Sequence, residues 1–307
     1  MHQLQNLFIM QITMFILMFA GFVLTKKQLL NEPFRKALTD FLLKFILPCN
    51  IIKSFLMEFN LQILKDCSAI LLLSFGIQVL SIILGRTIYR KTESGKRETL
   101  QYGMLVSNAG FLGNPVMEGI YGAQGLLYAS IYLIPVRISM WSLGIACFTG
   151  RSGKGVLRRI LTHPCIIATI IGLFLMLTGI SLPQWITKPI TLTGSCNTAL
   201  SLLVVGGVLA SLNPKNLFDK DCLGFCVLRL IVVPLITLGG CLLLHTQPLV
   251  TQTAVLLAGM PAPLTAAMLA SQYGKDESLA VSMIFVSTLA SMITLPLLSI
   301  LVTTLVG

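Results

Sequence analysis

The chain reads Ser107-Asn108-Ala109-Gly110-Phe111-Leu112-Gly113-Asn114-Pro115-Val116-Met117-Glu118-Gly119 in the middle of an otherwise apolar run. A second cluster of helix-breaking residues lies in the other half of the chain and reads Gly259-Met260-Pro261-Ala262-Pro263-Leu264-Thr265. Proline removes a backbone donor and clashes with the preceding helical turn, and glycine adds backbone freedom. We therefore expect both helices to be broken, near the middle of their runs and at matching places in the two halves.

The apolar runs around these clusters place the chain in a membrane. The 307 residues are 55% hydrophobic and only 11% charged, with a mean hydropathy of +0.87, whereas soluble domains carry about 25% charged residues. A helix needs roughly 20 apolar residues to cross a bilayer, and continuous rather than alternating runs argue against a transmembrane barrel. We predict an all-α polytopic membrane protein with ten transmembrane helices at approximately 5–24, 37–57, 66–88, 99–120, 124–148, 160–180, 187–211, 220–244, 249–272 and 277–305.

The formal net charge of +11 follows the topology rather than a nucleic-acid surface. Sixteen Lys and Arg residues fall in alternate loops, those after the first, third, fifth, seventh and ninth spans, while only Lys65 and Lys188 fall in the others. Basic residues accumulate in short cytoplasmic loops, whereas a nucleic-acid binder clusters them on a soluble face. We expect a multi-pass plasma-membrane protein with both termini outside and no nucleic-acid partner.

Motifs for catalysis, metal binding or ATP hydrolysis do not occur in the sequence. It contains no H-E-x-x-H motif, no Walker motif G-x-x-x-x-G-K-[ST] and no C-x-x-C pair. The eight cysteines lie mostly within apolar runs, where they act as small buried residues. We predict that the protein is not an enzyme and has no metal or cofactor.

An internal duplication is indicated by two Tyr-Gly pairs. Tyr121-Gly122 and Tyr273-Gly274 each end one apolar run, each follows a breaking cluster, and each begins a very short turn into the next run. This divides the chain into halves at 1–150 and 151–307 with five predicted spans each. Because five is odd, the second half is inverted relative to the first, which is an architecture of secondary transporters.

Helices broken near the membrane centre present their N-termini there, and these attract anions. The side-chain amides of the two asparagines of the first cluster can also donate hydrogen bonds directly. The alternative is a pair of ordinary proline kinks, because proline and glycine are frequent in membrane helices. The candidate substrate-binding residues are Asn108, Gly113, Asn114, Pro115, Pro261, Ala262, Pro263 and Thr265.

Three charged residues fall deep within predicted spans. Arg137 and Arg229 lie near the centres of the fifth and eighth spans, where a charge needs a partner or a cavity. Glu118 is the only acidic residue that the predicted spans place at depth. Two hypotheses stay open: Glu118 only neutralises Arg137, or it carries a proton or tunes ion coupling while an arginine steers an anionic substrate.

These residues resemble a known family. The pattern N-x-G-x-x-G-x-P, formed by Asn108, Gly110, Gly113 and Pro115 and followed by Tyr121-Gly122, is similar to that of the auxin efflux carrier family, as is Pro261 followed by Tyr273. This family includes the plant PIN-FORMED carriers and bacterial transporters of malate or malonate. The resemblance implies a fold like that of bile-acid/sodium symporters, with the fourth and ninth helices crossing at their breaks. It also implies a scaffold at about 1–60 and 155–212, possible dimerisation through that scaffold, and a transport domain at about 61–150 and 213–307.

The resemblance further implies a secondary transporter that moves a carboxylate by an elevator-type, alternating-access movement. The plant carriers have a second proline where this chain has Ala266, and their long cytoplasmic loop is missing, so a small organic acid anion is favoured over auxin. Coupling to a proton, to sodium or to the membrane potential all stay open. The alternatives are a ligand-binding membrane sensor of the same fold and a cation- or proton-coupled symporter of the related bile-acid/sodium fold. Membrane lipid is the other expected partner.

Overall fold

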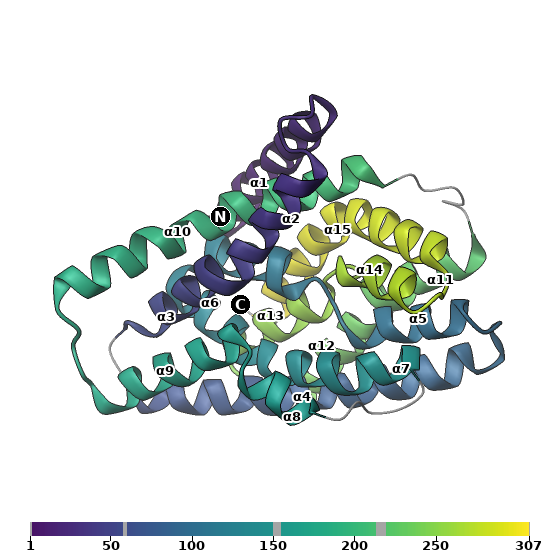
Figure 1. Cartoon of the computed structure of the whole chain (residues 1–307). Coiled ribbons are helices and arrows are strands. Elements are labelled where there is room, and N and C mark those ends of the chain that lie inside the picture. The colour runs from purple at the N-terminus through teal and green to yellow at the C-terminus, as the bar shows by residue number, and fades with distance from the viewer. Residues whose placement is uncertain (1, 58–59, 150–154, 213–218, 307) are drawn as a thin grey trace. The chain divides into compact units, whose positions relative to one another are not determined.

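The computed structural model describes residues 2–57, 60–149, 155–212 and 219–306, in which every regular element is a helix (Figure 1). The chain forms two compact units. Unit 1 comprises Met1–Ser68, Asn114–Ile131 and Leu157–Ser211, and unit 2 comprises Ala69–Gly113, Tyr132–Val156 and Leu212–Gly307. The predicted loop residues Arg151, Lys154 and Lys215, and the predicted boundary between residues 150 and 151, lie outside the described residues.

The helices of unit 1 are α1 (His2–Lys26), α2 (Glu32–Phe41), η1 (Leu42–Ile46), α3 (Leu47–Phe55), α8 (Val156–Leu161), α9 (Pro164–Thr178) and α10 (Gln184–Ser211). Two helices, α4 (Leu61–Ile88) and α6 (Asn114–Ser139), begin in unit 1 and continue into unit 2. The others in unit 2 are η2 (Tyr89–Lys91), α5 (Lys96–Leu105), η3 (Ala109–Gly113), η4 (Met140–Gly144), α7 (Ile145–Thr149), α11 (Lys220–Val227), η5 (Leu228–Val232), α12 (Val233–Leu243), α13 (Pro248–Ala258), α14 (Thr265–Gln272) and α15 (Glu277–Val306).

Several of these helices are suited to a lipid environment. Five helical stretches in the described part of the chain are long and apolar enough to cross a membrane: Leu61–Lys91, Lys96–Thr149, Gln184–Ser211, Lys220–Leu243 and Glu277–Val306. Large apolar side chains such as Leu72 and Ile83 on α4 are exposed, which is costly in water but not in lipid. The prediction of an all-helical, polytopic membrane protein is confirmed at this level.

Three π-helices precede a proline by the same spacing. In each case the π-helix ends two residues before the proline: η1 before Pro48, η3 before Pro115 and η5 before Pro234. Proline lacks an N–H group and clashes with the carbonyl one turn earlier, and the wider π-turn accommodates both defects. The helix therefore continues through Pro115, and the break that we predicted around this residue starts earlier in the chain, before Ala109.

Both predicted Tyr-Gly turns are present. Within α6 the backbone leaves helical geometry at Gly122, where φ is 62°, and Gly274 has a φ of 60° between α14 and α15. A residue with a Cβ atom is strained at positive φ, whereas glycine is not. Local backbone chemistry therefore explains why each Tyr-Gly pair ends a helical segment.

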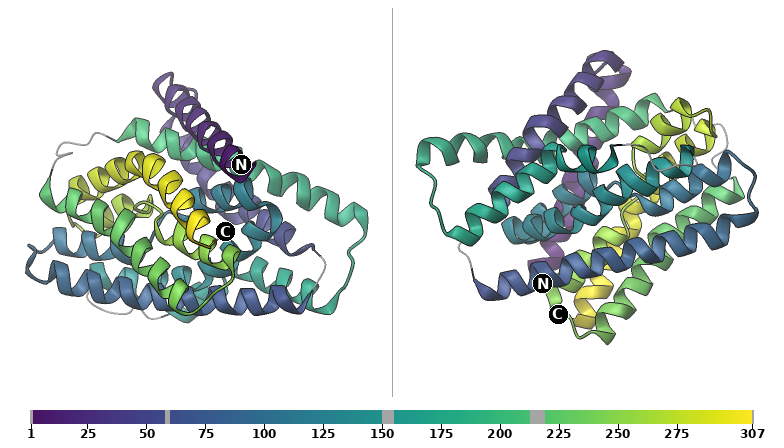
Figure 2. Two further views of the ribbon diagram at one scale, coloured as in Figure 1. Left: turned by 180° about the vertical axis from the view of Figure 1, so that it is seen from behind. Right: turned by 60° about the horizontal axis from the view of Figure 1, so that its bottom comes forward.

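Helices α1 and α10 pack closely within unit 1, and all three views show them crossing (Figures 1 and 2). Small residues on each helix make this contact possible. A Cβ atom at Gly21 would overlap the backbone carbonyl of Leu203, and one at Gly206 would overlap that of Met18. Such reciprocal glycines let the backbones of membrane helices approach closely.

Substitution of Gly206 by Ala is therefore expected to destabilise unit 1. The added methyl group meets backbone atoms that cannot rotate away, and overpacking of this kind costs about 1–3 kcal/mol. Gly224→Ala on α11 is the matched control, because a Cβ atom there has nothing within 4 Å. Thermal unfolding in detergent should give a lower Tm for Gly206→Ala only. Equal melting temperatures for the two variants would contradict the close α1–α10 contact.

Candidate functional site

Both predicted helix breaks are present, and both lie in unit 2. Helix α5 ends at Leu105, Val106 has the extended backbone angles φ −112° and ψ 140°, and η3 begins only at Ala109. In the second half, α13 ends at Ala258 and α14 begins at Thr265. The clusters of glycine and proline thus interrupt the helices as their residue types predict.

The two broken segments meet. The backbone N–H of Asn108 donates to the carbonyl oxygen of Pro261 at 2.9 Å. Next to this contact, the N–H of Ala262 donates to Ser287 Oγ on α15 at 3.0 Å. The hydroxyl groups of Thr265 and Tyr102 lie 2.8 Å apart. Non-helical backbone at membrane depth is tolerated only where protein or a water-filled cavity satisfies it, and these contacts provide part of that satisfaction.

Arg229 bridges the same two segments. Its Nη1 donates to the carbonyl of Met104, one residue before α5 ends, at 2.7 Å, and its Nε donates to the carbonyl of Met260 at 3.2 Å. The side chain comes from the π-helix η5 and is only 1% exposed. Within the described part of the chain Arg229 forms no ion pair with a carboxylate. The breaks therefore enclose a buried positive charge.

Within unit 2, unpartnered polar groups on the first broken segment accompany this charge. Asn108 is 3% exposed, and its side-chain Nδ2 has no hydrogen-bond partner among the described residues; the same holds for Ser107 Oγ. In unit 1, Asn114 is fully buried with both side-chain polar atoms unpartnered in the part of the chain that the structure describes. A buried donor without a partner costs about 1–3 kcal/mol, so such groups are expected where a ligand or water completes the hydrogen bonds.

The other predicted binding residues have mainly structural contacts. Gly113 faces α13, because a Cβ atom there would lie 2.7 Å from Leu257 Cδ2. Pro115 is buried near the start of α6, and the Pro263 carbonyl accepts from Ala266 N–H at 3.0 Å, at the start of α14. The candidates divide between the two units. Those in unit 2 are Asn108, Gly113, Pro261, Ala262, Pro263, Thr265 and Arg229, and those in unit 1 are Asn114, Pro115 and Glu118.

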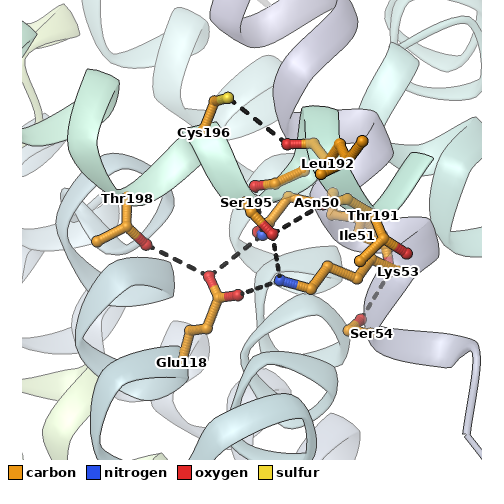
Figure 3. Close-up of polar contacts among 11 residues, drawn as sticks. Asn50, Ile51, Lys53, Ser54, Glu118, Thr191, Leu192, Ser195, Cys196 and Thr198 are labelled. Carbon is orange, nitrogen blue, oxygen red and sulfur yellow. Dashed lines mark hydrogen bonds and ion pairs between the residues drawn. The ribbon is translucent and has the colours of Figure 1, made fainter. Parts of the chain in front are cut away.

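Glu118 forms a polar cluster within unit 1 (Figure 3). Its Oε1 lies 2.8 Å from Lys53 Nζ, and its Oε2 accepts from Asn50 Nδ2 at 3.2 Å and from Thr198 Oγ1 at 3.3 Å. The Lys53 ammonium also donates to Ser195 Oγ at 3.1 Å. Within unit 1 the partner of Glu118 is therefore Lys53, because the carboxylate extends from α6 towards α3 and α10. Sequence analysis did not consider this pair.

Arg137 lies in unit 2 and is 7% exposed, and its Nη1 has no hydrogen-bond partner among the described residues. Burying a charge inside a membrane protein is costly unless it faces a partner or a cavity. Its role in charge balance stays a prediction.

A double-mutant cycle separates the two roles proposed for Glu118. If the carboxylate only neutralises Lys53, Glu118→Gln and Lys53→Met should each lower the transport activity that the family resemblance implies. The double variant should then recover most of it, because a partly buried charge left alone is the main cost. If Glu118 carries a proton, the double variant stays inactive although it folds. Transport rates of the four proteins in liposomes, at matched incorporation, decide between these outcomes.

One buried carboxylate of unit 1 was not expected from the sequence. Asp66 in α4 is 5% exposed; it accepts from Tyr128 OH at 2.7 Å and from Gln62 Nε2 at 2.8 Å, all within unit 1. Asp66 is thus buried, whereas Glu118 is only half-buried. Asp66 stands at the edge of its apolar run, and a charged residue in that position is typical of a loop. The roles of Asn50, Lys53 and Tyr102 were missed because they depend on which helices pack together.

Comparisons with known proteins agree on one class of protein. The sequence profile of the family described as "Membrane transport protein" matches residues 7–157 and 151–299. The chain is 28% identical to an uncharacterized transporter of Methanothermobacter thermautotrophicus over 298 residues, which cover 94% of this chain and 96% of the relative. It is 26% identical to an uncharacterized transporter of Methanocaldococcus jannaschii over 296 residues, covering 92% of this chain and 94% of that protein.

Proposed function

The chain belongs to the auxin efflux carrier family of membrane transport proteins, and from this premise we propose that it is a secondary transporter of a small organic anion. The observation that carries the proposal is the meeting of the two broken helices around Arg229. A positive guanidinium without a carboxylate partner among the described residues attracts an anion. The unpartnered amide of Asn108 is a hydrogen-bond donor for a carboxylate oxygen. The departures from the plant carriers favour a small organic acid over auxin.

We propose ten spans arranged as two inverted repeats, and an elevator-type movement of the transport domain at about 61–150 and 213–307. Most of this domain falls in unit 2, although residues 114–131 belong to unit 1. The stretch Lys96–Thr149 has 54 residues, whereas roughly 20 helical residues cross a bilayer; it therefore accommodates two spans joined at Gly122. The division of the chain into two compact units supports a scaffold and a moving domain. Spin labels, one in each unit, should report a distance that changes when the anion is added. An unchanged distance would argue against the elevator.

The proposed sidedness rests on contacts between loops in unit 2. Lys96 Nζ lies 3.0 Å from Asp219 Oδ2, and Thr99 Oγ1 donates to the Asp276 carbonyl at 3.5 Å. The hydrogen bond from Lys96 holds the pKa of Asp219 below its usual range. Three of the loops proposed to be cytoplasmic, after the third, seventh and ninth spans, thus share one end of the unit. This supports a common side, which the excess of basic residues assigns to the cytoplasm.

The substitution Ser94→Cys at an exposed position should therefore give a thiol that reacts with a membrane-impermeant maleimide only from the cytoplasmic side. The reaction is measured on intact cells of the expression host and on inverted vesicles. The background carries Cys196→Ser, because Cys196 is the one exposed cysteine in the described part of the chain. Labelling of the introduced thiol on intact cells would invert the proposed topology.

Counterflow in liposomes tests the transport function. Vesicles containing the purified protein and preloaded with unlabelled malate, malonate or a related acid should accumulate the labelled acid, with and without a pH gradient. Measurable binding without counterflow would instead support a ligand-binding sensor. Dependence of uptake on a proton or sodium gradient would identify a coupled symporter or antiporter.

A further inference from the structure

A polar cavity lies within unit 2, among α4, α5 and the η4–α7 segment. Its volume is about 330 Å³. It is lined by Arg86 near the end of α4, Arg97 at the start of α5, Gln101 in the middle of α5, and Cys147 on α7. Arg86, Arg97 and Gln101 are not among the candidate binding residues at the breaks, so the function proposed above leaves this cavity unexplained.

The cavity carries an excess of positive charge. Its one acidic lining residue in the described part of the chain, Glu98, accepts hydrogen bonds from Arg97 Nη2 at 3.0 Å, from Ser94 Oγ at 3.4 Å and from the backbone N–H of Gly95. Donors at and just before the start of α5 therefore already use the hydrogen-bonding capacity of this carboxylate. Arg86 forms no ion pair within the residues that the structure describes. One guanidinium charge thus remains without a partner at the cavity.

A buried hydroxyl group points to a ligand in the same place. Ser81 lines the cavity, is 1% exposed, and its Oγ has no hydrogen-bond partner among the described residues. An unpartnered buried hydroxyl is costly, and an anionic oxygen would accept its hydrogen bond. The other lining residues include apolar Ile82, Leu105 and Leu143. The lining therefore combines cationic and hydrogen-bonding groups with an apolar wall.

We propose that this cavity binds a phosphate group, supplied by the headgroup of an anionic phospholipid. Arg86 provides the unpaired charge and forked donors for phosphate oxygens. Arg97 adds donors other than the Nη2 group that binds Glu98, Ser81 and Gln101 provide further hydrogen bonds, and the apolar residues contact the start of the acyl chains. Basic pockets between membrane helices on the cytoplasmic side bind anionic lipid headgroups. The proposal does not depend on which anion the protein transports.

The reactivity of Cys147 tests the proposal, because this thiol lines the cavity. The full chain is placed in nanodiscs of phosphatidylcholine with or without phosphatidylglycerol, and in a third arm glycerol 3-phosphate is added to the phosphatidylcholine discs. Maleimide labelling is located at Cys147 by peptide mass spectrometry, and Tm is measured in parallel. With the ligand at about ten times its dissociation constant, labelling should slow about tenfold and Tm should rise. Arg86→Gln should abolish both effects of phosphatidylglycerol.

Arg90→Gln is the matched control, because Arg90 is an exposed arginine of η2 that does not line the cavity. It should keep both effects of phosphatidylglycerol. Protection by glycerol 3-phosphate but not by phosphatidylglycerol would overturn the lipid as the source and support a soluble phosphate ligand. The same labelling rate and the same Tm in all three arms would overturn the phosphate site itself. None of these measurements involves transport, so their failure leaves the proposed transport function intact.

Discussion

Replacement of Arg229 by Met is expected to weaken binding of the transported anion by at least about tenfold, because a hydrogen bond to a charged group contributes about 1.5–3 kcal/mol. The guanidinium is 1% exposed and has no carboxylate partner in the described residues, so its charge is available to an anion. The substitution also leaves the carbonyl groups of Met104 and Met260 without their donor. We therefore expect Tm to fall together with affinity.

Arg229→Lys separates the charge from the bridge. Lysine keeps the positive charge, but its ammonium lacks the planar fork that reaches both carbonyl groups. Tm should fall as in the Met variant, whereas much of the anion affinity should remain. Binding is measured by titration calorimetry in detergent, after size-exclusion chromatography has shown that each variant is folded. A folded Met variant that binds the anion as tightly as the natural chain would exclude Arg229 from the binding site.

Asn108→Ala should produce the opposite combination, a loss of affinity without a loss of stability. The backbone N–H that joins the breaks is retained in alanine, while the removed side-chain Nδ2 has no partner among the described residues. Loss of one hydrogen bond to a charged ligand should weaken binding about tenfold to a hundredfold. Because an unsatisfied buried group disappears, Tm should stay the same or rise.

The control for Asn108 is another buried asparagine. Asn197 on α10 is 1% exposed, and its Nδ2 is also unpartnered in the described part of the chain. Asn197→Ala should leave anion affinity unchanged. Transport is followed by counterflow and affinity by calorimetry. If Asn108→Ala and Asn197→Ala had equal effects on affinity, the amide of Asn108 would have no special role in the site.

The prediction of the helix breaks and turns was accurate where backbone chemistry is local. The positions of both breaks follow from clusters of glycine and proline, and the turns at Gly122 and Gly274 follow from the need for positive φ. The prediction was less accurate at Pro115, where a π-turn lets the helix continue. Spacing along the chain does not show whether a helix absorbs a proline or breaks at it.

Partners of charged side chains were predicted poorly. Arg137 was considered as a partner of Glu118 in one of two hypotheses because it lies in the next predicted span, whereas the pair within unit 1 is Glu118 with Lys53 from α3. The hydrogen bond of Asp66 to Tyr128 was missed because Tyr128 lies 62 positions further along the chain. A polar side chain on a helix is directed by the rotation of that helix, and this rotation is set by packing against elements that are distant in sequence.

The sequence by itself determined the helical, membrane-embedded character of this protein and the places where its helices are interrupted. These features depend on the solvent preference of continuous apolar runs and on the backbone limits of glycine and proline, which act within a few residues. The tertiary structure alone decided that the two breaks join through Asn108 and Pro261 and that Arg229 bridges them. Unsatisfied backbone N–H and C=O groups at a break can bond to any suitable partner, and the packing of the helices selects the partner that is within reach.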